Sequence, residues 1–143
     1  MEDDTLDSLK SLHTHAIDAR HGYEEALKDA DGRGLTGLFR QMIALHETNA
    51  EELSAYLVRA GAQVNDDGSF MSTVHRTIMS VRSLFNGLDE SVLPGLIDGE
   101  ERNKTSYDKA LQPQTVPADI RSLLMKQRDR ISASIAEMKA REH

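Results

Sequence analysis

The chain has 143 residues, no cysteine, and 17 basic against 24 acidic side chains, which leaves a net charge of −7. A chain of this length can bury the core of one domain, so we expect a single domain over residues 1–143. The missing cysteines exclude thiolate metal sites and disulfides, and the acidic balance disfavours nucleic-acid partners. The sequence begins Met-Glu-Asp-Asp and lacks a long apolar run, which predicts a cytoplasmic protein with no membrane partner.

The first two predicted helices occupy residues 4–30 and 35–60, on either side of the break Asp-Gly-Arg-Gly at 31–34. Apolar residues recur in both at intervals of three and four, which places them on one helix face. His13 and Arg20 interrupt the first apolar stripe, and His46 and Asn49 interrupt the second. Because the break is short, we expect an antiparallel hairpin in which Arg20 and His46 lie at nearly the same height.

Three further helices are predicted, at residues 70–86, 91–111 and 117–141. The first of them would span only about 26 Å at the usual helical rise, whereas the last two are close in length to the first pair. No run of residues alternates with the period of a strand. The sequence therefore predicts an all-α, four-helix bundle in which the helix at 70–86 crosses over between two hairpins. A five-helix up-and-down arrangement is the alternative.

Glu100 stands in the middle of the apolar face of the helix at 91–111, with Leu96, Tyr107 and Leu111 on the same face. Burying an unpaired carboxylate costs on the order of several kcal/mol, so Glu100 needs a cation, a metal, hydrogen-bond donors or a proton. Our preferred interpretation pairs Glu100 with Arg20 inside a polar layer at the middle of the bundle. The expected members of this buried polar layer are Arg20, His46, Asn49, Glu100, Asn103 and Gln127.

Short motifs occur along the chain in a fixed order, namely Gly22-Tyr23, Gly68-Ser69, His75-Arg76, Gly99-Glu100-Glu101, Tyr107 and Ala110-Leu111. Together they resemble a bacterial family of uncharacterised four-helix-bundle proteins in the ferritin-like superfamily. The resemblance covers nearly the whole chain and implies a ferritin-like bundle. It implies no activity, because the function of that family is unknown.

The ferritin-like resemblance also implies a di-metal site, with one Glu from each of two helices and Glu-x-x-His from each of the other two. No Glu-x-x-His occurs in this sequence, and the comparable interior positions hold His46-x-x-Asn49 and Glu100-x-x-Asn103. A ferritin-type di-iron centre is therefore disfavoured. The metal alternative is a single site for iron, manganese or zinc, with ligands drawn from Glu100, His46, Glu24 and Glu52.

Three classes of function remain open. The preferred one is a non-enzymatic helical protein that acts through self-association or a protein partner, with a stress response as one candidate setting. The others are a metal-binding, ferroxidase-like oxidoreductase and a small-ligand binder that uses the polar layer. Self-association into a homo-oligomer is expected because Leu38, Ile43 and Leu57 fall beside the core stripes. No catalytic residue is assigned.

Overall fold

The computed structural model describes residues 3–29, 35–62 and 93–141, which form four helices. They are α1 (Asp3–Asp29), α2 (Thr36–Arg59), α4 (Leu93–Leu111) and α5 (Ala118–Arg141). The described residues contain no strand, so the predicted all-α class is confirmed for this part of the chain. The predicted crossover helix at 70–86 lies outside the described residues.

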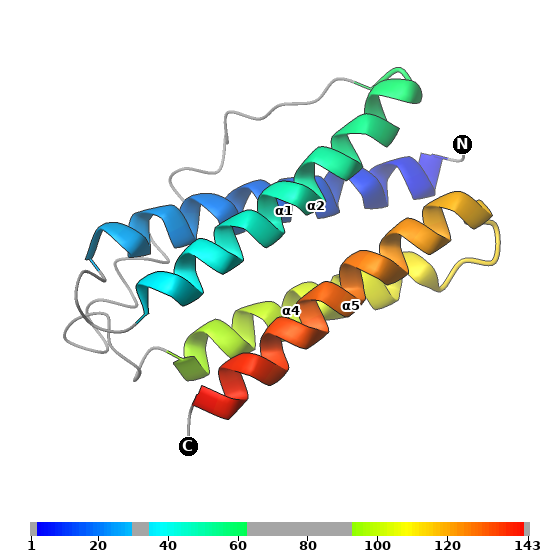
Figure 1. Ribbon diagram of the computed structural model, residues 1–143. Helices are drawn as coiled ribbons and strands as arrows, with labels where there is room; N and C mark the ends of the chain where they lie inside the picture. Colours follow the sequence, from blue (N-terminus) through cyan, green and yellow to red (C-terminus); the bar gives the residue numbers. More distant parts are fainter. Residues whose placement is uncertain (1–2, 30–34, 63–92, 142–143) are drawn as a thin grey trace.

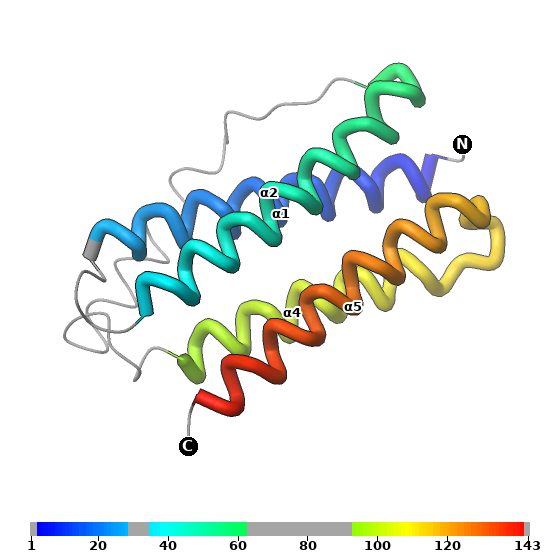
Figure 2. Tube along the Cα trace, viewed as in Figure 1, coloured from blue at the N-terminus to red at the C-terminus, as the bar shows by residue number. Residues whose placement is uncertain are grey.

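The four helices form two antiparallel hairpins that pack against each other, α1 with α2 and α4 with α5 (Figure 1). The colours in Figure 2 show that α2 and α4 run in the same direction. Side-chain contacts agree, because Gln41 and Glu52 of α2 contact Glu137 and Lys126 of α5 in antiparallel order. Since α5 is antiparallel to both α2 and α4, α2 and α4 are parallel to each other. An up-and-down bundle of these four helices alone would make them antiparallel, whereas the five-helix up-and-down alternative would also make them parallel.

The end of α2 illustrates how local sequence fixes a boundary. Gly61 has φ +79°, a left-handed conformation that glycine adopts without strain. In this geometry the Gly61 amide donates to the carbonyl of Val58, and the Ala62 amide donates to the carbonyl of Leu57. These two bonds satisfy carbonyls that the helix end would otherwise leave unpaired. The stop predicted at Gly61 is thus explained by a Schellman motif.

The core runs along the axis between the two hairpins and receives apolar side chains from all four helices. Its fully buried large residues include Leu9, Phe39, Met42, Leu53, Leu93, Leu124, Ile131 and Met138. Leu38 and Leu57 are also fully buried, and Ile43 packs against this core. These three residues had been expected to supply an outer apolar surface, and that expectation is wrong for Leu38 and Leu57. The buried face of α2 is wider than one narrow stripe, because α2 packs against both α1 and α5.

None of the helices in the described part of the chain combines the length and hydropathy needed to cross a membrane.

Candidate functional site

Glu100 of α4 lies inside the bundle, 4% exposed, and binds two side chains through a single oxygen. The hydroxyl of Tyr23 in α1 donates to Glu100 Oε2 over 2.7 Å, and His46 Nε2 of α2 lies 2.9 Å from the same oxygen. The rings of Tyr23 and His46 stack, with centroids 5.8 Å apart and an interplanar angle of 15°. We call Tyr23, His46 and Glu100 the acid cluster. It joins three of the four helices.

The acid cluster keeps Glu100 ionised. Burial alone would raise the pKa of Glu100, but attraction to His46 and hydrogen bonds from His46 and Tyr23 outweigh it and hold this pKa below its ordinary value. Burial beside the carboxylate raises the pKa of Tyr23 well above its usual range, so Tyr23 remains a phenol and donates. Because a carboxylate can only accept, the proton in the second bond belongs to His46 Nε2.

Arg20 is not the partner of Glu100. Its Nε lies 3.2 Å from Glu24 Oε1 on the same helix, and its side chain remains 23% exposed. The predicted Arg20–Glu100 ion pair is therefore wrong, and Tyr23, three residues further on, takes the place of Arg20. The physical reason is desolvation, because a phenol brings a hydrogen-bond donor into the core without adding the charge of a guanidinium. The one signal in the sequence was a tyrosine, rather than a phenylalanine, in an interior position at this height.

A second set of polar side chains connects α2, α4 and α5, and we call it the amide cluster: Asn49, Glu52, Tyr107, Gln127 and Arg130. Gln127 is fully buried, and its Oε1 accepts from the hydroxyl of Tyr107 over 2.7 Å. Its Nε2 donates to the backbone oxygen of Asn49 and to Glu52 Oε1, both at 3.1 Å. Both ends of this amide are therefore used, which locks α5 in one register against α2 and α4.

Arg130 closes the amide cluster towards solvent. Its Nη1 donates to Asn49 Oδ1 over 2.9 Å and to Glu52 Oε1 over 2.6 Å. Burial would raise the pKa of Glu52, but hydrogen bonds from Arg130, Gln127 and Lys126 lower this pKa to about 2. Glu52 thus stays charged and acts as an ion-pair partner between α2 and α5.

The predicted polar layer corresponds to parts of both clusters. His46 and Glu100 belong to the acid cluster, Asn49 and Gln127 to the amide cluster, and all four are buried. Arg20 and Asn103 are only partly buried. Several buried atoms here have no hydrogen-bond partner within the described residues, namely Glu100 Oε1, His46 Nδ1, Asn49 Nδ2 and Asn103 Oδ1. Hydrogen bonds therefore connect the residues within each cluster, but the described residues do not supply a partner for every buried polar atom here.

The side chains named from the sequence as metal ligands lie in different surroundings. His46 and Glu100 contact each other, whereas Glu24 pairs with Arg20, and Glu52 pairs with Arg130 and Lys126. Within residues 3–29, 35–62 and 93–141, no three His, Asp or Glu side chains gather as metal ligands would. The four residues therefore do not form one ligand set.

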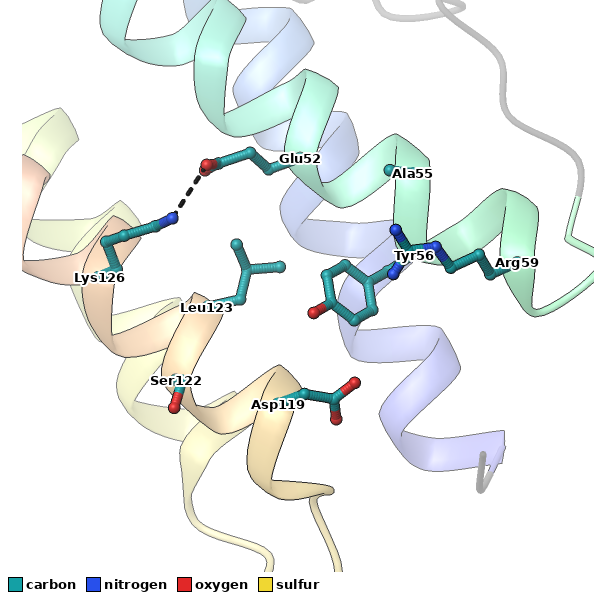
Figure 3. Close-up of a pocket in the computed structure, with 8 residues that line it drawn as sticks. All are labelled: Glu52, Ala55, Tyr56, Arg59, Asp119, Ser122, Leu123 and Lys126. Carbon is teal, nitrogen blue, oxygen red and sulfur yellow. Dashed lines mark ion pairs between the residues drawn. The ribbon is translucent and has the colours of Figure 1, made fainter.

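On the surface, an open groove of about 420 Å³ lies between the C-terminal half of α2 and the first turns of α5 (Figure 3). At one end Lys126 Nζ pairs with Glu52 Oε2 at 3.2 Å. On the α2 wall the guanidinium of Arg59 lies 5.1 Å from the centroid of the Tyr56 ring. The lining residues are Glu52, Ala55, Tyr56, Arg59, Asp119, Ser122, Leu123 and Lys126. Sequence reasoning missed this groove, because it depends on the separation of two helices.

The helices and clusters define the class of the molecule, a helical bundle with a hydrogen-bonded polar interior. Residues 4–113, which include α2, α4 and nearly all of α1, match a family described as Domain of unknown function (DUF2383). The chain belongs to this family. No curated protein matches the chain.

Proposed function

We propose that the protein is a ferritin-like helical bundle that catalyses no reaction and acts by associating with a second copy of itself or with another protein. The observation that supports this best is the setting of Glu100. Its Oε2 accepts hydrogen bonds from Tyr23 and His46, and its side chain is 4% exposed. A carboxylate held in this way joins helices and fixes their register, and it is closed off from a substrate in bulk solvent.

The arrangement of the hairpins supports the ferritin-like part of this proposal. The parallel directions of α2 and α4 agree with a long connection between two helical hairpins, as in ferritin-like bundles, and they do not fit an up-and-down order of these four helices alone. The polar clusters also lie midway along the bundle, where such proteins carry their polar interior. In this chain those positions hold Tyr23, Asn49 and Gln127 in addition to one Glu and one His.

Association is tested by measuring the mass of the protein in solution across micromolar concentrations by light scattering. The proposal predicts a dimer or a larger assembly of defined mass. A monomer at every concentration would contradict self-association and would leave only a separate protein partner.

A second candidate function is the binding of a metal ion or a small ligand between the helices. The observation that favours it is the set of buried atoms without a partner in the described residues, which includes Glu100 Oε1 and His46 Nδ1. A buried unpaired polar atom costs about 1–3 kcal/mol, so a guest that bonds to such atoms would recover part of that cost. Elemental analysis of protein purified without a chelating column is the test. Stoichiometric iron, manganese or zinc supports this candidate, and trace metal alone removes its metal form.

A further inference from the structure

We infer that the groove between α2 and α5 is the contact surface of a two-fold symmetric dimer, in which Arg59 of each protomer pairs with the partner's Asp119. This inference rests on the self-association proposed above and names the surface responsible for it. The argument depends on the charges at one end of the groove and on the apolar side chains between them.

Two charged side chains at this end have no ionic partner among the described residues. Arg59 comes from α2 and Asp119 from α5, so they line opposite walls of the groove (Figure 3). Arg59 lies over the Tyr56 ring, and Asp119 Oδ1 accepts a hydrogen bond from the backbone amide of Ile120 over 2.9 Å. Neither forms an ion pair within the portions of the chain that the structure describes. At the opposite end, by contrast, Glu52 and Lys126 already pair with each other.

A surface that carries one unpaired cation and one unpaired anion is complementary to itself. A two-fold axis through this end of the groove places each Arg59 opposite the partner's Asp119, so both pairs form at once. A patch with charges of only one sign would instead repel the same patch on a second copy of the chain. The equal charges also give a nucleic acid or another polyanion no net attraction, which favours a second copy as the occupant.

The side chains between the charges suit a protein contact. Tyr56 is partly exposed and provides apolar area, whereas Leu123 is buried, and the exposed Ala55 is small enough to let another helix approach α2 closely. Tyrosine and arginine are the residue types enriched at the centres of protein interfaces, and stacking on Tyr56 already restrains the Arg59 side chain.

Two charge reversals test the pairing. Arg59→Asp gives a chain with two acidic groups at this end, and Asp119→Arg gives a chain with two basic groups. Each variant alone should raise the dimer dissociation constant roughly tenfold or more, because like charges then face each other. An equimolar mixture of the two should associate again, because both cross pairs are restored. Arg40→Asp, an exposed reversal elsewhere on α2, is the matched control and should leave association unchanged.

The masses are measured by sedimentation at physiological salt, and circular dichroism checks that each variant is folded. If Asp119→Arg fails to fold, Asp119→Asn keeps an acceptor for the Ile120 amide and should still weaken the dimer. If the wild type is dimeric and the reversals leave it so, or if the mixture stays monomeric, this surface is wrong and self-association stands. A monomeric wild type overturns both this surface and self-association, and leaves only association with a separate protein.

Discussion

Tyr23 of α1 and Glu100 of α4 are 77 positions apart in the sequence, and a hydrogen bond of 2.7 Å joins them in the core. The bond crosses from one helical hairpin to the other, so it fixes how the hairpins fit together. His46 adds a second bond from α2 to the same oxygen of Glu100. The bundle therefore depends on a charged group that it keeps away from water.

Removing the Tyr23 hydroxyl should weaken the fold without leaving a large cavity. In Tyr23→Phe, Glu100 loses one of its two donors, and we expect a loss of about 1–3 kcal/mol in the free energy of unfolding. Denaturant titration measures it. Tyr56→Phe is the matched control, since Tyr56 lines the surface groove, and it should change stability by about 0.5 kcal/mol or less. Equal effects in the two variants would argue against a structural role for the Tyr23–Glu100 bond.

Gln127→Leu should lower the free energy of unfolding, because Gln127 joins α5 to both α2 and α4. The substitution keeps an apolar stem in the core but removes the acceptor for Tyr107 and the donor for the Asn49 backbone oxygen. Each buried group left unpaired costs about 1–3 kcal/mol, so the variant should unfold at clearly lower denaturant concentration. Ala133→Leu, at an exposed position on the same helix and outside the groove, serves as the control. A Gln127→Leu variant as stable as the wild type would mean that the amide cluster contributes no net stability.

Glu52 should make the protein sensitive to acid. Its pKa is lowered from 4.5 to about 2 in the folded state, so its contribution to stability is fully present above pH 4.5. That contribution is lost as the pH falls from 4.5 through about 2. In Glu52→Gln the free energy of unfolding should therefore fall less steeply over this range than in the wild type. If the free energy of unfolding falls equally steeply with pH in the two proteins, Arg130 and Lys126 do not lower the pKa of Glu52 as described.

Chelators should leave stability unchanged. The side chains considered as ligands lie in separate surroundings, with Glu24 on Arg20 and Glu52 on Arg130. Thermal unfolding with and without a strong chelator provides the measurement. A midpoint that drops with chelator, and recovers when one metal is added back, would favour the metal-binding candidate instead.

The positions of the four described helices and the interior place of Glu100 could be predicted because helical periodicity resolves which face a residue occupies. The partner of Glu100 could not. Arg20 and Tyr23 lie less than one turn apart on α1, and choosing between them requires the rotation of one helix against another, which a single sequence does not contain. Tyr107 was likewise counted as apolar, although its hydroxyl bonds to Gln127. A pattern that sorts residues only into apolar and polar does not show the hydrogen bonds that tyrosine hydroxyls make.

The same limit applies to the amide cluster. Gln127 and Asn49 were recognised as polar residues in apolar stripes, whereas Glu52 and Arg130 lie at the edge of the interface and were not placed in the layer. Their pairing depends on how closely α2 and α5 approach each other. The groove lined by Arg59 and Asp119 depends on the same distance.

The most direct test of a structural Glu100 is a double-mutant cycle between His46 and Glu100, measured by denaturant titration with and without chelator. His46→Leu alone should cost about 3–5 kcal/mol, because it leaves a buried carboxylate short of a partner. The double variant with Glu100→Leu should cost clearly less than the two single losses added, whereas Arg20→Leu should be additive with Glu100→Leu. Additive losses for His46 and Glu100, together with stability that falls on chelation, would contradict the account.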